Sequence, residues 1–206
     1  HLLAQTARPM LVGTWAAASD EAGTIARYEV RWRVDGSLGS PTTLAASTRQ
    51  ASRRMKTDHT YALRLRARDA AGNWSPWVES TPFAPVLSQD TSPTLARSGG
   101  WTRYRRSWMS GGTSLYSRTR GKWVERSFTG RAIALVGSKS PGRGKAKVYI
   151  DGVLAATVDF RRSSAAHRQV VFTRSWAAAR PHTLKVVVLG TSGRPRVDVD
   201  AFVIVP

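Results

Sequence analysis

The stretch YALRLRARDAAGNWSPW, Tyr61 to Trp77, decides the fold of the first part of this chain. Apolar and polar residues alternate strictly through YALRLRAR. Since successive side chains of a strand point to opposite faces, the alternation predicts a strand with Tyr61, Leu63, Leu65 and Ala67 on one face and arginines on the other. The Gly-Asn pair predicts a turn, after which WSPW begins the next strand.

This stretch resembles the F strand and following turn of a fibronectin type III domain. Trp15, in LVGTWAAASD, stands where that family has its strand-B core tryptophan, and ARYEVRWRVDG resembles strand C running into a turn at Asp35-Gly36. Tyr61 stands at the tyrosine-corner position, which implies a buried ring and a hydroxyl bonded to upstream backbone. The resemblance covers about residues 5–87 and implies a fold without a chemistry.

The WSPW segment is similar to the WSxWS element of cytokine-receptor fibronectin domains, in which tryptophans and arginines stack alternately. Val78 replaces the final serine of that element. We expect the aromatic rings to stack with the strand arginines as a stabilising ladder, and a ligand surface is the alternative. The residues concerned are Trp74, Trp77, Arg64, Arg66 and Arg68, with Arg31 and Arg33 as further candidates.

A second alternating pattern begins beyond a polar segment. KAKVYIDGVLAATVDF, Lys145 to Phe160, holds two alternating runs around Asp151-Gly152. Asp-Gly favours a two-residue type I′ turn because both positions need positive φ, so this segment predicts a hairpin. Further strands are predicted at WVERSFTG, RAIALVGS, RQVVFTRSW, HTLKVVVLG and RVDVDAFVIV, and no helix is predicted.

The order of these strands resembles the galactose-binding-like jelly roll of carbohydrate-binding modules, above all the domains of secreted actinobacterial proteins. In those modules the Asp-Gly hairpin and the His-Thr-Leu strand start shape the scaffold, and loop aromatics and polar groups hold sugar. We therefore expect an all-β chain with two β-sandwich domains. Residues 1–87 form the fibronectin type III-like domain, residues 88–97 (SQDTSPTLAR) a linker, and residues 98–206 the jelly roll.

Positive charge is concentrated in the second half. The whole chain carries a net charge of +19, and residues 98–206 hold fifteen Arg and five Lys against five acidic residues. Such a surface attracts polyanions in a salt-sensitive way. No helix-turn-helix, RNP signature or zinc finger is present, so sequence-specific nucleic-acid binding is not expected.

Catalysis is not expected, and no catalytic residue is assigned. The chain has no cysteine, and its histidines are His1, His59, His167 and His182. No nucleophile elbow, phosphate-binding loop or zinc-spaced histidine pair occurs. We therefore predict that the chain is not an enzyme.

Aromatic and basic residues with loop-like neighbours are the predicted ligand-binding set. A sugar ring stacks on an exposed indole, and arginines bind hydroxyls or a carboxylate. The set is Tyr104, Trp108, Arg118, Arg120, Lys122, Trp123 and Trp176.

Asp198 and Asp200 stand two apart in the terminal strand and therefore share a face. VDVDAF resembles the terminal motif of calcium-dependent jelly-roll modules, which makes these acids weak candidates for a structural calcium. The expected first strand, GGWTRYRRSW, has arginines where those families have glutamates. We expect no cofactor and predict that the acids pair with Arg103, Arg105 or Arg106.

The predicted function is non-catalytic binding to a glycan or cell surface, with anionic polysaccharides among the candidates. The first alternative is a structural building block of an extracellular filament, tail fibre or larger secreted protein, which pairs with copies of itself. The second is nonspecific binding of nucleic acid or other polyanions. No apolar run of about 18 residues predicts a membrane span, and the expected location is extracellular or cell-surface.

Overall fold

The computed structural model describes residues 2–4, 10–19 and 23–206. Its elements are eighteen strands and one short 3₁₀ turn, η1 (Ser110–Gly112), so the prediction of an all-β chain is confirmed. The described part of the chain contains no helix long and apolar enough to cross a membrane. His1 lies outside the described residues.

The first sandwich consists of two facing sheets. One sheet has the order β1-β2-β6, and the other has the order β4-β3-β7-β8 with β5 also paired to β3. The bounds of these strands are β1 Leu2–Ala4, β2 Met10–Thr14, β3 Ile25–Val34, β4 Ser37–Leu38, β5 Thr42–Ala45, β6 Gln50–Arg54, β7 Tyr61–Asp69 and β8 Val78–Glu79.

On strand β7, Tyr61 and Leu63 are buried as the alternation predicts, but Ala62, which the alternation places on the other face, is buried as well. Tyr61 is 2% exposed, and its hydroxyl donates to the Lys56 carbonyl at 3.1 Å and accepts from the Lys56 amide at 2.9 Å. This is the upstream backbone bond expected at Tyr61. The bond ties the start of β7 to the segment after β6.

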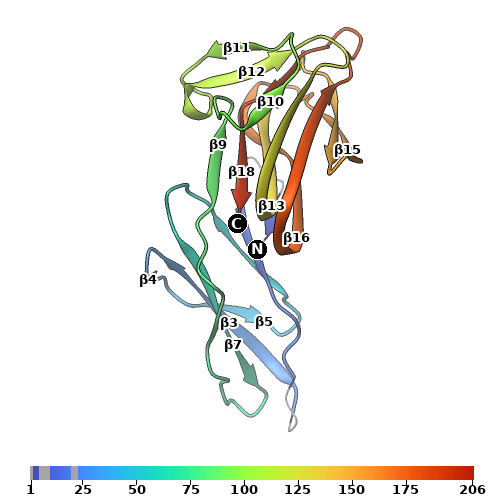
Figure 1. Ribbon diagram of the computed structural model, residues 1–206. Coiled ribbons are helices and arrows are strands. Elements are labelled where there is room, and N and C mark those ends of the chain that lie inside the picture. The colour runs from blue at the N-terminus through green and yellow to red at the C-terminus, as the bar shows by residue number, and fades with distance from the viewer. Residues whose placement is uncertain (1, 5–9, 20–22) are drawn as a thin grey trace.

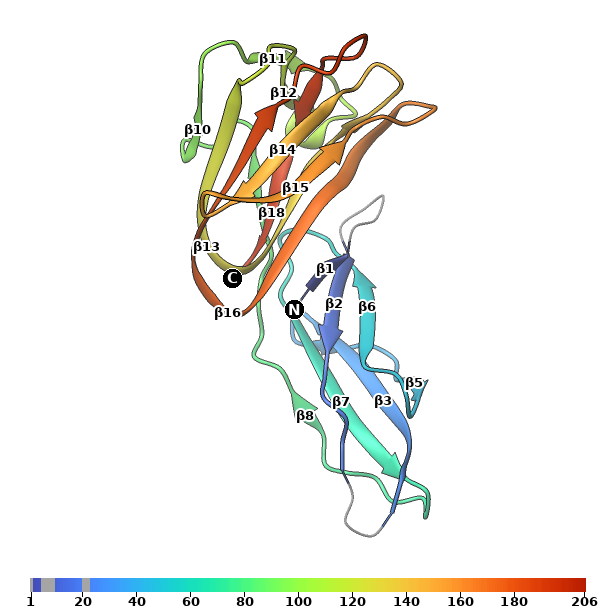
Figure 2. The ribbon, with the colours of Figure 1, turned by 90° about the vertical axis from the view of Figure 1, so that its right-hand side faces the viewer.

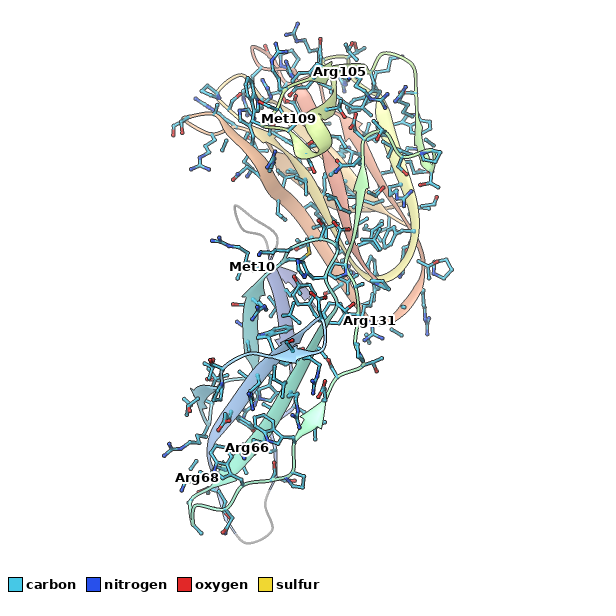
Figure 3. The ribbon with its side chains drawn as sticks, turned by 90° about the vertical axis from the view of Figure 1, so that its left-hand side faces the viewer. Met10, Arg66, Arg68, Arg105, Met109 and Arg131 are labelled. Carbon is cyan, nitrogen blue, oxygen red and sulfur yellow. The ribbon has the colours of Figure 1, made fainter. Side chains whose placement is uncertain are left out.

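Arginines and tryptophans alternate on the outer face of the same sheet. The guanidinium of Arg66 lies 4.1 Å from the Trp74 ring centroid and 4.6 Å from that of Trp77. Arg64 contacts Trp77 at 5.0 Å, and Arg68 contacts Trp74 at 5.7 Å. The predicted ladder is present at one end of the first sandwich, where Figure 3 labels Arg66 and Arg68. Arg33 does not join it and instead binds Glu79 at 2.6 Å.

The second sandwich has a seven-stranded sheet and a three-stranded sheet. The larger sheet has the order β15-β14-β16-β13-β18-β9, with β10 also paired to β13, and the smaller sheet has the order β11-β12-β17. The bounds are β9 Val86–Gln89, β10 Leu95–Arg97, β11 Thr102–Arg105, β12 Thr113–Ser117, β13 Trp123–Lys139, β14 Lys145–Ile150, β15 Val153–Asp159, β16 Ala166–Val188, β17 Val197–Val199 and β18 Ala201–Val205. Figures 1 and 2 show this unit above the first sandwich.

Two strands of the larger sheet are buried on both faces. In β13, Ile133 and Leu135 belong to the core of the second sandwich, whereas Ala132 and Ala134 join the apolar cluster of the first. Strand β18 divides in the same way: Ala201, Val203 and Val205 join the apolar cluster of the first sandwich, and Phe202 and Ile204 join the core of the second. The small outward residues allow the first sandwich to pack closely on this sheet. Arg131 lies at this junction (Figure 3).

The segment expected as a linker, residues 88–97, is largely built into the second sandwich. Strand β9 pairs with β18, and β10 pairs with β13. Asp90 follows β9 and is 1% exposed. The polar composition of SQDTSPTLAR predicted a linker, but both ends of the segment pair in the sheet and its acid is bound by Arg103 at 2.8 Å. The division of the chain into two domains remains our prediction.

Candidate functional site

The predicted ligand-binding residues lie in several places and do not form one constellation. Tyr104 is on β11, Trp108 is in the connection from β11 to η1, Trp123 begins β13 and Trp176 lies within β16. Arg118, Arg120 and Lys122 belong to the connection between β12 and β13. Strand β11 belongs to the smaller sheet, whereas β13 and β16 are adjacent in the larger one. Trp123 pairs with Val187, far along β16 from Trp176, so the two tryptophans lie apart.

Tyr104 and Arg118 do come together, around residues that the sequence did not indicate. The guanidinium of Arg196 lies 4.6 Å from the Tyr104 ring centroid and 4.0 Å from that of Tyr116. Arg118 lies 5.8 Å from the Tyr116 centroid. The Tyr104 hydroxyl donates to Asp198 at 3.0 Å. This stack is therefore tied to a buried acid.

Trp123 and Trp176 have protein partners on their rings. The ammonium of Lys185 lies 4.3 Å from the Trp123 centroid. Trp176 stacks on His182 with a centroid separation of 3.8 Å and an interplanar angle of 14°. Trp176 also packs against the core of the second sandwich. Both rings would have to exchange a protein contact for a sugar.

The two terminal acids are fully buried. Asp198 accepts from Arg196 at 2.6 Å and also forms an ion pair with Arg143. The expected partners Arg103, Arg105 and Arg106 are therefore wrong for Asp198. Arg196 stands two residues before Asp198 and forms a backbone bridge with Arg143, which brings both guanidinium groups to the acid. Arg103 binds Asp90 instead.

Asp200 contacts a backbone amide. Both of its carboxylate oxygens accept from the Ser110 N–H, at 3.0 and 3.1 Å. Burial raises the pKa of Asp200 to about 7, against the effect of the Ser110 hydrogen bond. Within the described ranges no three His, Asp or Glu side chains gather as an ion site. The expectation of no cofactor stays a prediction.

Trp108 is the predicted residue with the most accessible ring. It is 48% exposed, and its ring lies 5.6 Å from the His167 ring at an angle of 37°. Arg106 lies 5.9 Å from the Trp108 centroid. Burial, followed by the charge of Arg143, lowers the pKa of His167, so the imidazole is neutral at neutral pH. Trp108 and His167 thus form an aromatic surface open to solvent.

A cleft of about 770 Å³ lies beside this surface, between the two sandwiches. The second sandwich contributes Ser110, His167 and Arg168, and the first contributes Arg54 and Lys56. Among the described residues that line it, cations are present and carboxylates are not. Binding clefts commonly form at such junctions and combine apolar walls with a few polar groups.

Sequence reasoning missed His167 and Arg168 as companions of Trp108. Arg168 bonds to the backbone of Met109, 59 residues away, and no local pattern connects the two segments. It also missed the pair between Ser138 and His167, whose Oγ and Nδ1 atoms lie 3.1 Å apart. The Ser138 side chain is fully buried.

Comparison with known proteins gives one curated relative of interest and no matching family model. The chain is 34% identical over 126 residues to a protein of Flavonifractor plautii named "A type blood N-acetyl-alpha-D-galactosamine deacetylase". The match covers 61% of this chain and 15% of that relative.

Solved structures with similar folds include two carbohydrate-binding modules. The family 35 module from Clostridium thermocellum has a TM-score of 0.45 and 14% identity, over 58% of this chain and 98% of that one. The CBM36-1 domain of a xylanase from the hindgut metagenome of Trinervitermes trinervoides has a TM-score of 0.42 and 16% identity, over 58% and 95%. A family two carbohydrate esterase from Cellvibrio japonicus has a TM-score of 0.45 and 10% identity, over 60% and 34%.

These comparisons correct one prediction. We predicted that the chain is not an enzyme, and that prediction is contradicted by a relative named for a deacetylation reaction. The prediction rested on the small number of histidines and on the absence of familiar catalytic motifs, and such absences do not exclude an enzyme. The second sandwich is all-β, as predicted, with one seven-stranded and one three-stranded sheet.

Proposed function

We propose that this chain binds a glycan as part of a carbohydrate-active enzyme. The curated relative is named as a deacetylase of an N-acetylated sugar, which supports a role for this chain in an enzyme that acts on glycans. The match spans 15% of that protein. In this proposal a fibronectin type III-like unit holds a jelly roll of the kind found in secreted actinobacterial proteins. The chain would work outside the cell or at its surface, where polysaccharides occur.

The observation that carries the proposal is the exposed Trp108 ring beside His167 and the cleft. A sugar presents a C–H face that packs on an indole, while its hydroxyls need polar partners. Arg106 and Arg168 stand near the ring and in the cleft as donors. A neutral His167 adds a ring nitrogen that serves as donor or acceptor.

The charge of the cleft favours an anionic glycan. Arg54, Lys56 and Arg168 line it from both sandwiches. Guanidinium groups bind carboxylate or sulfate oxygens through charge-assisted hydrogen bonds. We therefore propose a polysaccharide with acidic sugars as the preferred ligand.

The test is a binding panel of neutral, N-acetylated and acidic polysaccharides, with DNA as the polyanion control. Binding would be followed by calorimetry at about 50 mM and about 500 mM salt. We expect one glycan to keep measurable binding at the higher salt concentration, although its charge contacts weaken there, and Trp108→Ala should reduce its affinity about tenfold or more through loss of the stacking surface. Trp74→Ala is the matched control, since Trp74 is an exposed tryptophan of the arginine ladder.

Two outcomes would contradict the proposal. Binding of DNA and every acidic polymer that disappears at high salt would leave only nonspecific polyanion attraction. Equal affinities of Trp108→Ala and the unaltered chain for the preferred glycan would remove Trp108 from the site.

A structural role is supported by a separate observation. Strand β15 forms one edge of the larger sheet, and its Val153 and Leu154 are 71% and 49% exposed. An apolar edge strand offers unpaired backbone groups to another strand. Light scattering that shows concentration-dependent association, lost in Leu154→Lys, would favour assembly with copies of the chain, and a monomer at all concentrations would oppose it.

A further inference from the structure

Met109, the residue after Trp108, anchors the connection between β11 and η1. Met109 is 1% exposed, although Trp108 is largely open to solvent. The Ser138 hydroxyl donates to the Met109 sulfur at 3.6 Å, and the Tyr104 oxygen, whose proton goes to Asp198, lies 3.8 Å from the same sulfur. Figure 3 labels Met109 beside the η1 turn of the second sandwich. The Met109 side chain therefore anchors the middle of the segment 106–112.

Arg168 holds the same segment from the side. Its Nη2 atom donates to the carbonyls of Ser107 and Met109, at 3.1 and 3.0 Å. These carbonyls flank Trp108 on both sides in the sequence. Arg168 follows His167, so one segment of β16 supplies both the ring that Trp108 contacts and the bonds that hold its backbone.

Asp200 is the third residue that holds the segment 106–112, through a hydrogen bond to its backbone. The Ser110 amide, two residues after Trp108, donates to both oxygens of the Asp200 carboxylate. Asp200 has no exposed surface, so it cannot touch a ligand in the cleft. Ser110 itself lines the cleft. A change at Asp200 therefore reaches the site through Ser110.

We propose that Asp200 is a positioning residue for Trp108, and that its protonation releases Ser110 and weakens glycan binding in mildly acidic solution. This inference rests on the proposed function of the Trp108 surface. A carboxylate accepts from Ser110 N–H through two equivalent oxygens. A protonated carboxyl group has one hydroxyl oxygen, which is a weaker acceptor and needs a partner for its own proton.

The surroundings of Asp200 place this change near neutrality. Burial disfavours its charged form, and the charges of Asp90 and Asp198 add to that effect. The Ser110 amide and the positive charge of Arg168 oppose it. The result is a pKa of about 7. His167, on β16 beside Arg168, titrates below its usual pKa and is the second group whose protonation can reach Trp108.

The experiment measures glycan affinity between about pH 5.5 and about pH 8.5 for the unaltered chain, Asp200→Asn and Asp159→Asn. Affinity of the unaltered chain should fall about threefold to tenfold toward the acidic end, the equivalent of one net hydrogen bond. Asp200→Asn should bind with no such dependence on pH. Asp159→Asn should behave as the unaltered chain, because Asp159 pairs with Arg194 away from the cleft.

A second readout needs no glycan. The emission of the unaltered chain minus that of Trp108→Phe isolates Trp108, and we expect it to change near neutral pH and to lose this change in Asp200→Asn. If Asp200→Asn does not fold, His167→Gln replaces it, and the emission change should then persist. Loss of the change in His167→Gln, or its persistence in a folded Asp200→Asn, would assign it to another group and overturn the proposal.

The two proposals fail in different ways. If Trp108→Ala binds glycan normally at every pH, the proposed function fails, whereas the emission titration still tests the role of Asp200. If Trp108→Ala loses binding but the affinity of the unaltered chain is independent of pH, only the role of Asp200 fails.

Discussion

His182 Nδ1 lies 2.7 Å from a carboxylate oxygen of Asp151, whose other oxygen accepts from the amide of Thr183 at 2.7 Å. The first sandwich repeats this arrangement, with His59 at 2.5 Å and the Thr60 amide at 2.8 Å from Asp35. Each acid begins an Asp-Gly hairpin turn, and each His-Thr pair leads into or lies within a third strand. In both sandwiches, therefore, the aspartate of a hairpin turn binds the His-Thr pair of a neighbouring strand and holds the hairpin against that strand.

The glycine of each turn should resist substitution. Gly36 and Gly152 have a φ of +81°. An alanine there occupies the left-handed region and should lower the free energy of unfolding by about 1–2 kcal/mol. Denaturant unfolding of Gly36→Ala and Gly152→Ala tests this. Gly99→Ala is the control, because an added Cβ meets no atom within 4 Å at any of the three positions but Gly99 is not among the glycines with positive φ. Equal stability of all three variants would be the contrary result.

The Tyr61 hydroxyl should contribute measurably to the first sandwich. Tyr61→Phe removes both hydrogen bonds to Lys56, so the Lys56 amide loses the Tyr61 oxygen as its acceptor. We expect a loss of about 1–3 kcal/mol in the free energy of unfolding. Tyr149→Phe serves as a control, because no hydrogen bond of its hydroxyl is found in the described part of the chain. If Tyr61→Phe and Tyr149→Phe had the same denaturation midpoint, the Tyr61 hydroxyl would have no stabilising role.

Arg66 lies at the centre of the arginine-tryptophan ladder. Arg66→Gln removes its contacts with Trp74 and Trp77 and its 3.0 Å ion pair with Glu29. Partly exposed contacts of this kind contribute about 0.5–1 kcal/mol each, so a total loss of about 1–2 kcal/mol is expected. Calorimetric melting measures it, and Arg53→Gln, at an exposed position of β6, should melt as the unaltered chain does.

Asp200 should make stability depend on pH in an unusual direction. Its pKa is 3.8 in an unfolded chain and about 7 when folded, so the unfolded chain releases the proton first as pH rises. Its stabilising contribution is complete below about pH 4 and is lost as pH rises to about 7. The difference corresponds to about 4 kcal/mol as an upper bound.

Unfolding of Asp200→Asn should therefore lack this decline. Comparison of the two chains across the same pH range isolates the contribution, because Asp35, Asp69 and Glu79 have lowered pKa values and act in the opposite direction at lower pH. A constant stability difference between the two chains from about pH 4 to about pH 8 would show that Asp200 does not titrate there.

Calcium should leave the melting temperature unchanged. Arg143 and Arg196 bind Asp198, and Arg103 binds Asp90, so cationic side chains already neutralise these carboxylates. Calcium needs six to eight oxygen ligands. Melting with excess calcium and with a chelator is the measurement, and a rise of several degrees with calcium would reveal a site.

The sequence by itself determined the strands and several local bonds. Strict alternation places Tyr61 and Leu63 on a buried face because strand geometry alone fixes side-chain direction. Asp-Gly produces its turn because glycine and aspartate tolerate positive φ locally. The stacking of Arg66 with Trp74 is equally local, since Trp74 follows the end of β7 after a short turn and bridges back to Arg68.

Only the tertiary structure decided the candidate site. Trp108 contacts His167, and Asp198 is bound by Arg143 and Arg196 instead of the arginines of β11. The first sandwich buries the outward face of β18. Asp90 lies inside the second sandwich because β9, the strand before it, pairs with β18. Sheet order, and the burial that accompanies it, set these contacts between residues far apart in the chain. Alternation specifies which face of a strand is apolar, but it does not specify which other segment will cover that face.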